Sequence, residues 1–127
     1  MPFPLLFHRF LTFGRRAELL AIDYVRSVGY RVVTSGYRTK SGEVDVIAWD
    51  GNVLVFIEVK ARQNSEPPED SVGFSKQQRI IRAAHSYISR HRLHDSPYRF
   101  DIVSVTVLPA SKPEFRLLRD AFRADGS

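Results

Sequence analysis

Two apolar runs joined by a short turn signal constrain the fold of this chain more than any other feature. Residues 43–49 and 53–61 are rich in Val, Ile and Phe, and Asp50-Gly51 lies between them. An Asp-Gly pair between such runs is a strong signal for a β-hairpin. Apolar residues occupy both faces of each run, which is typical of central strands in α/β sheets. We therefore expect the hairpin to lie inside a sheet that is covered on both faces.

Charged residues gather at the open end of this hairpin. Alternate side chains of a strand point to opposite faces, so Glu58 and Lys60 share one face. With Asp50-Gly51 as the turn, Asp45 lies opposite Phe56 and diagonal to Glu58, roughly 7–8 Å away between backbones. Two carboxylates this close repel each other unless a cation lies between them, and a divalent metal beside Lys60 would meet that need. The alternative is a solvated strand end with a Glu–Lys pair.

The composition indicates one small domain with a basic surface. The chain has 127 residues, of which 43% are hydrophobic and 26% charged, and these are ordinary values for a globular domain. The absence of cysteine excludes disulfides and thiolate metal ligands and favours a reducing, cytoplasmic location. The net charge is +5, and 15 of the 19 basic residues are arginine, which binds phosphate in a bidentate manner. Nucleic acid is a partner that would explain this excess, and general solubility charge is the alternative.

Hydrophobic periodicity predicts a helix and a strand before the hairpin and a second helix and further strands after it. These elements cover residues 14–28, 30–35, 75–90, 99–108 and 114–122, the last as a short strand or a helical tail. Ser75 is the expected N-cap of the second helix. The polar, proline-containing residues 63–73 are typical of a loop, which could fold over a substrate.

The domain boundaries follow from this order of elements. We expect a single domain over residues 14–122, followed by a tail over 123–127. The apolar segment over 1–13 is interrupted by proline and basic residues, so it is neither a signal peptide nor a membrane span. It could remain loose, dock onto a partner or lie on a lipid surface.

Helical spacing predicts which faces of the two helices are buried. The expected apolar faces comprise Ala17, Leu20, Ala21, Tyr24, Val25 and Val28 in the first helix and Ile80, Ile81, Ala84, Tyr87 and Ile88 in the second. Glu18 borders the first face, either looking inward over the sheet edge or serving as an ordinary first-turn glutamate. Lys76 lies in the first turn of the second helix, where a cation opposes the helix dipole, which hints at a functional lysine. For Asp101 we favour a capping role at the start of its strand over a further site carboxylate.

The carboxylates and the lysine of the hairpin fit metal-assisted hydrolysis of a phosphodiester bond. Asp45 and Glu58 would hold Mg²⁺ or Mn²⁺ through oxygen ligands, and Glu18 could add a third carboxylate. The metal would polarise the phosphoryl oxygen and lower the pKa of the attacking water. Lys60 would orient that water or stabilise charge that develops on the phosphoryl oxygens.

Taken together and in this order, the motifs resemble the bacterial YraN-like proteins, a family similar to the archaeal Holliday junction resolvases within the PD-(D/E)xK nuclease superfamily. The residues that carry the resemblance are Gly14-x-x-Ala17-Glu18, Gly42-Glu43-Val44-Asp45, Phe56-Ile57-Glu58-Val59-Lys60-Ala61-Arg62, Lys76 and Arg99-Phe100-Asp101. The likeness implies a restriction-endonuclease-like αβββαβ core, with a mixed central sheet flanked by helices.

The resemblance also implies roles for particular residues. Glu18, Asp45, Glu58 and Lys60 match the metal-binding and catalytic positions of the superfamily, and Val44 stands where many members have proline. Arg38, Arg62, Lys76 and Arg79 are the candidate nucleic-acid contacts. Resolvases of this kind act as dimers because two symmetric cuts need two sites, so a homodimer is implied as well.

Three functions are consistent with these expectations. The first is a metal-dependent endonuclease acting on DNA, more so than on RNA, with branched or damaged DNA as the expected substrate. The second is a nucleic-acid-binding module that keeps the fold without the catalysis. The third is an interaction or assembly protein whose apolar N-terminus docks a partner.

Overall fold

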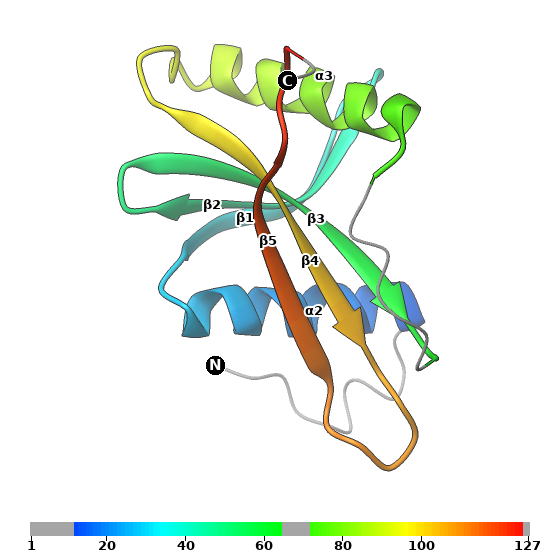
Figure 1. The fold of residues 1–127 in the computed structure, drawn as a ribbon. Coiled ribbons are helices and arrows are strands. Elements are labelled where there is room, and N and C mark those ends of the chain that lie inside the picture. The colour runs from blue at the N-terminus through cyan, green and yellow to red at the C-terminus, as the bar shows by residue number, and fades with distance from the viewer. Residues whose placement is uncertain (1–11, 65–71, 126–127) are drawn as a thin grey trace.

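Five strands form one sheet, and a helix covers each of its faces (Figure 1). The computed structural model describes residues 12–64 and 72–125. The elements are α2 (Phe13–Ser27), β1 (Arg31–Arg38), β2 (Glu43–Asp50), β3 (Val53–Arg62), α3 (Phe74–Arg90), β4 (Tyr98–Thr106) and β5 (Glu114–Phe122). Nearly all of the predicted N-terminal segment, most of the predicted loop over 63–73 and the end of the predicted tail lie outside the described residues.

The sheet is mixed, with the strand order β1-β2-β3-β4-β5. Strands β3 and β4 are parallel, and the other three neighbouring pairs are antiparallel. The parallel pair requires a connection that crosses a face of the sheet, and α3 supplies it. The predicted α/β class and the αβββαβ order are therefore confirmed. The segment over 114–122, left open between strand and helix, forms the edge strand β5.

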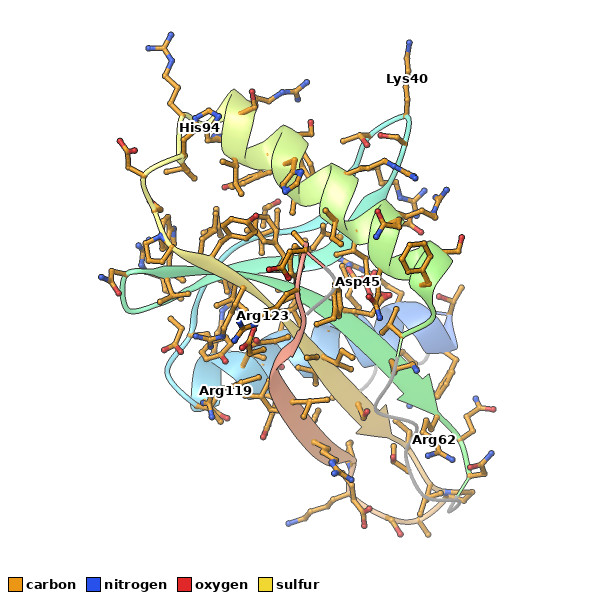
Figure 2. All side chains as sticks on the ribbon, turned by 45° about the horizontal axis from the view of Figure 1, so that its top comes forward. Lys40, Asp45, Arg62, His94, Arg119 and Arg123 are labelled. Carbon is orange, nitrogen blue, oxygen red and sulfur yellow. The ribbon has the colours of Figure 1, made fainter. Side chains whose placement is uncertain are left out.

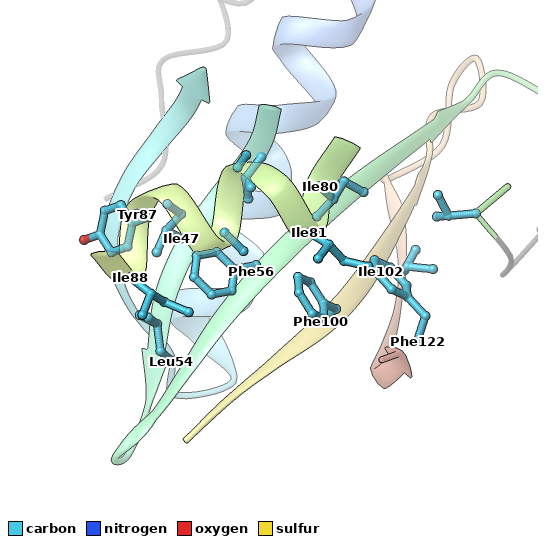
Figure 3. Close-up of a cluster of buried hydrophobic side chains, with 14 residues drawn as sticks. Ile47, Leu54, Phe56, Ile80, Ile81, Tyr87, Ile88, Phe100, Ile102 and Phe122 are labelled. Carbon is cyan, nitrogen blue, oxygen red and sulfur yellow. The ribbon is translucent and has the colours of Figure 1, made fainter. Parts of the chain in front are cut away.

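The apolar faces of the hairpin are both buried, as the sequence predicted. Ile47, Leu54 and Phe56 have no exposed surface and pack beneath α3 (Figure 3). The Phe56 ring lies 5.8 Å from the ring of Phe100 in β4. Residues of the opposite face, such as Val55, pack against α2. Each such side chain contributes about 1.5–3 kcal/mol when it is fully buried.

The buried stripe predicted for α3 is confirmed, whereas the face predicted for α2 is partly wrong. Leu19 and Ile22 are buried in place of Val28, which is 39% exposed. Val28 is the C-cap residue, so it lies past the last helical turn instead of over the sheet. Tyr24 is half-buried because its ring stacks flat against Phe115 of the edge strand, with centroids 4.6 Å apart. Neither helix of the described residues is long and apolar enough to cross a membrane.

The predicted register of the hairpin is wrong by two residues. Asp50 pairs with Val53, so Gly51 and the following residue form the turn, and Phe56 lies opposite Ile47 instead of Asp45. Gly51 has a φ of +60°, a conformation that glycine adopts without strain. The carboxylate of Asp50 is held in the strand by Arg99 of β4, 2.7 Å away. That long-range ion pair is not visible in the local turn signal.

Asp101 is neither a capping residue nor a site carboxylate. It is completely buried and accepts hydrogen bonds from the Tyr30 hydroxyl at 2.7 Å and from the backbone N–H of Asp120 at 2.9 Å. Arg99 completes this network with an ion pair to Asp101 at 3.0 Å. A second prediction that was wrong is the N-cap at Ser75. The N-cap is Gly73, two residues earlier, so helix α3 begins at Phe74, and it has no side-chain cap.

Candidate active site

The two hairpin strands separate at the position of Asp45. Their pairing runs from the turn as far as Val46 opposite Ile57, and beyond it β2 and β3 diverge (Figure 1). Asp45 Oδ2 accepts a hydrogen bond of 2.8 Å from the backbone N–H of Val59. The side chain of Asp45 therefore takes the place of a backbone partner in the ladder, because a buried N–H group needs an acceptor. This opening lets residues from both faces of the sheet approach the same point.

Glu58 is the buried carboxylate of the site. Its side chain is 5% exposed, and Oε2 lies 3.1 Å from Lys76 Nζ. Among the described residues, Oε2 has no hydrogen-bond partner of regular geometry. Burial raises the pKa of Glu58 to about 8, and the neighbouring Asp45 carboxylate adds to the rise through a shared hydrogen bond and charge repulsion. The attraction of Lys76 opposes this rise without cancelling it.

Glu18 belongs to α2, which covers the face of the sheet opposite to α3. It forms an ion pair with Arg15, one turn earlier in the helix. Burial raises the pKa of Glu18, and the negative charge of Asp45 raises it further, while Arg15 lowers it. Glu18 is thus near enough to Asp45 for their charges to interact, but it already has a partner of its own.

The two lysines of the candidate site, Lys60 and Lys76, lie on different elements. Lys60 is half-buried on β3, two residues beyond Glu58 and opposite Ser104 of β4. Lys76 is 57% exposed on the first turn of α3 and reaches Glu58 from above the sheet. Its pKa is raised because attraction to Glu58, Asp45 and Glu43 outweighs the effect of burial, so its ammonium group stays charged.

The candidate nucleic-acid contacts lie on either side of the carboxylates. Arg38 ends β1 and is 80% exposed, with Glu43 at 3.5 Å. Arg62 ends β3 and donates to Asn64 at 2.9 Å, while Arg79 is exposed on α3. Figure 2 shows Asp45 between Lys40 on the turn beside α3 and Arg62 at the far end of β3. In this view, basic side chains thus lie on both sides of Asp45.

Gly42 fixes the β1–β2 turn against α3. A Cβ atom at this position would lie 1.8 Å from the backbone oxygen of Arg79. Only glycine permits this approach. Thr39 closes the turn by accepting the Gly42 N–H at 3.1 Å. Nothing in the sequence indicates that Gly42 packs against Arg79, which is 37 positions later in the chain.

The donor atoms suit a hard divalent cation, although the carboxylates do not form a complete cluster. Within residues 12–64 and 72–125, no group of three or more His, Asp or Glu side chains has the arrangement of a metal site. Asp45 and Glu58 nevertheless bring carboxylate oxygens together, and Glu58 Oε2 is buried without a regular hydrogen bond. Oxygen donors of this kind are the ligands of Mg²⁺ and Mn²⁺, which commonly keep several waters. The donor type of Asp45 and Glu58 is thus compatible with such an ion.

The fold and the site define an α/β protein with a paired-carboxylate site at a split in a mixed sheet. The chain belongs to the family described as uncharacterised protein family UPF0102, whose model matches residues 17–105. That range includes every carboxylate and lysine of the candidate site. The expected membership among YraN-like proteins is confirmed at the level of this family.

Several members of the family align with most of this chain. A UPF0102 protein of Geotalea uraniireducens is 40% identical over 111 residues, which cover 86% of this chain and 87% of that protein. A second, from Symbiobacterium thermophilum, is 39% identical, and the alignment covers 87% of this chain and 96% of that protein. A third, from Solibacter usitatus, is 45% identical, and the alignment covers 86% of this chain and 84% of that protein. The alignments thus extend over nearly whole proteins.

Proposed function

We propose that this protein is a metal-dependent endonuclease that hydrolyses phosphodiester bonds in DNA. The observation that carries the proposal is the pair of Asp45 and Glu58 at the strand split, where Glu58 is buried and its pKa is raised to about 8. Strongly perturbed carboxyl groups beside a specific charged partner are characteristic of functional sites. A purely structural pair would be expected to avoid this electrostatic cost.

Asp45 and Glu58 would hold Mg²⁺ or Mn²⁺ through their carboxylate oxygens. When bound, the ion supplies a Lewis acid that polarises the phosphoryl oxygen and lowers the pKa of the attacking water. Lys60 would stabilise negative charge on the phosphoryl oxygens or orient the water. Glu18 is held by Arg15 beside Asp45, where it could accept a hydrogen bond from a water molecule of the site.

The resemblance to archaeal Holliday junction resolvases of the PD-(D/E)xK superfamily supports branched DNA as the substrate. The basic groups on both sides of the carboxylates support a polyanion, and arginine suits phosphate contacts. A homodimer would supply the two sites that symmetric cutting of a junction requires.

A nucleic-acid-binding module without catalysis is the second candidate, and one observation favours it. Glu58 is already paired with Lys76, and Asp45 with the Val59 N–H, so both carboxylates have partners within the protein. The third candidate, an assembly protein that uses the apolar N-terminus, concerns a segment outside the described residues and stays a prediction.

Replacement of Asp45 by asparagine tests the proposed activity. Asparagine can still accept the Val59 N–H through its amide oxygen, so the fold is kept while the charge is lost. The wild type should cut a labelled four-way junction, flap or duplex with Mg²⁺ or Mn²⁺. Asp45→Asn should lose at least a hundredfold in rate with DNA affinity changed less than about threefold.

The assay includes Asp95→Asn as a matched control, because Asp95 is exposed and lies in the loop after α3. Equal cleavage by the wild type and Asp45→Asn would contradict the nuclease. Metal-independent DNA binding with no cleavage of any substrate would favour the binding module.

A further inference from the structure

The ion pair between Lys76 and Glu58 joins one fixed partner and one movable partner. The Glu58 side chain is 5% exposed and belongs to a central strand, whereas the Lys76 side chain is 57% exposed. Glu58 has little room to change its rotamer because its side chain is buried. Lys76 has a long, flexible side chain that can swing into solvent at little cost. Any exchange of partners at this site therefore occurs on the side of Lys76.

The ammonium group of Lys76 and a divalent cation at this site would compete for the Glu58 carboxylate. Nζ lies 3.1 Å from Glu58 Oε2, which is buried and has no hydrogen bond of regular geometry among the described residues. A divalent ion binds a carboxylate oxygen at about 2.0–2.6 Å, so it would enter the space that the ammonium group now takes. Two cations at that distance also repel each other. Binding of a divalent ion at Glu58 thus displaces Lys76.

Once displaced from Glu58, Lys76 would pair with a phosphate group as its new anionic partner. Lys76 lies in the first turn of α3, which has no side-chain cap and no acidic residue in that turn. Phosphate is favoured at a helix N-terminus, while a lone cation there is disfavoured. A phosphate group above the site would therefore attract Lys76 away from Glu58 and leave the two carboxylates without their cation.

We propose that Lys76 exchanges between Glu58 and a substrate phosphate, so that phosphate binding and divalent-cation binding favour each other. Without substrate, Lys76 occupies Oε2 of Glu58 and keeps the divalent cation out. With substrate, Lys76 holds the phosphate and Glu58 receives the cation. The identity of the phosphate as nucleic acid rests on the proposed function, but the competition for Glu58 does not.

The first test measures Mn²⁺ binding by calorimetry in the absence of DNA. Lys76→Met should bind Mn²⁺ about tenfold more tightly than the wild type because the competing ammonium group is gone. Arg90→Met is the matched control, since it removes one positive charge from the same helix. Its position, 14 residues further along, is about 21 Å away and beyond the screening length at ordinary salt. The control should stay within about twofold of the wild type.

Lys76→Arg keeps the positive charge and should retain weak Mn²⁺ binding like that of the wild type. Circular dichroism and thermal unfolding establish that each variant is folded, and Lys76→Gln replaces Lys76→Met if the latter is not. Equal or weaker Mn²⁺ binding by the charge-removing variant, including no binding at all, would overturn the proposal.

The second test measures the affinity for a fluorescent four-way junction with and without Ca²⁺ as the divalent probe. Coupling between two ligands is reciprocal, so Ca²⁺ should tighten DNA binding by the wild type and by Arg90→Met. In Lys76→Met this tightening should fall at least threefold, and an unchanged value would contradict the exchange. If Lys76 competes with Mn²⁺ but no DNA is cut, the nuclease fails and the competition stands. If DNA is cut but Lys76 does not compete with Mn²⁺, the nuclease stands and the exchange fails.

Discussion

At the scale of single residues, Glu58 shows how a site can be costly to the fold. Its carboxyl group is buried beside Asp45, and both features disfavour its charged form. Lys76 offsets part of this cost with one half-exposed ammonium group. An apolar residue at this position would fit the buried face of β3 more easily. The presence of a carboxyl group there supports a chemical role over a structural one.

The raised pKa of Glu58 predicts that stability depends on pH in a particular direction. The folded protein keeps a proton on Glu58 up to about pH 8, whereas the unfolded chain releases it near pH 4.5. Between these values the folded state binds more protons, so the free energy of unfolding should fall as pH rises, by up to roughly 5 kcal/mol in total. The fall should level off above pH 8. Glu18 contributes in the same direction.

Urea unfolding at several pH values in EDTA would measure this dependence. Glu58→Gln should remove most of the fall. Glu114→Gln, on the exposed end of β5, is the control and should keep it. An equally steep fall in Glu58→Gln would show that other groups are responsible.

At the scale of elements, the divergence of β2 and β3 creates the site. Asp45 satisfies the Val59 N–H that the ladder leaves without a backbone partner, and α2 and α3 then reach the gap from opposite faces. The β1–β2 turn is held against α3 at Gly42, so this side of the gap has little freedom to move.

The close approach at Gly42 predicts opposite effects for two glycine substitutions. Gly42→Ala places a methyl group against the Arg79 carbonyl and should lower the free energy of unfolding by about 2–3 kcal/mol, because backbone must shift. Gly14→Ala lies in α2 with nothing within 4 Å and should raise it by about 0.5 kcal/mol. Thermal and urea unfolding measure both. A neutral Gly42→Ala would mean that the turn does not pack on α3 in solution.

At the scale of the whole molecule, the excess of arginine predicts how nucleic-acid binding responds to salt. If Arg38, Arg62, Lys76 and Arg79 each contact one phosphate, log affinity for duplex DNA should fall with log salt at a slope of about −3.6. The double variant Arg62→Gln, Arg79→Gln should reduce the magnitude of the slope by about 2. Arg90→Gln, outside this set, should leave it unchanged. Fluorescence anisotropy between about 50 and 300 mM salt measures these slopes, and a flat response would exclude an interface of this kind.

Local signals in the sequence were sufficient for the class of fold and for most elements. Apolar faces with clear periodicity, such as that of α3, were predicted correctly because burial follows from spacing alone. The hairpin register was not predicted correctly, because Arg99, which belongs to β4, holds Asp50 in strand β2. Asp101 was misread for the same reason, since its partners Tyr30 and Asp120 are distant in sequence.

The candidate site was predictable in its residue types but not in its arrangement. Alternation along the strands placed Glu58 and Lys60 on one face and suggested a nearby Asp45. No sequence pattern indicated that the strands would separate there, or that Lys76 would be the partner of Glu58. Both features depend on the twist of the sheet and on how α3 crosses it.

The hydrogen bond from Val59 to Asp45 makes a single amide proton a reporter of the site. Its exchange with solvent and its resonance frequency depend directly on whether the carboxylate accepts the bond or turns toward another ligand. A titration with a diamagnetic divalent ion such as Mg²⁺, followed by NMR, would therefore register an event at Asp45 through the signal of its neighbour across the gap. The Val59 amide thus reports on the site without any chemical modification of the protein.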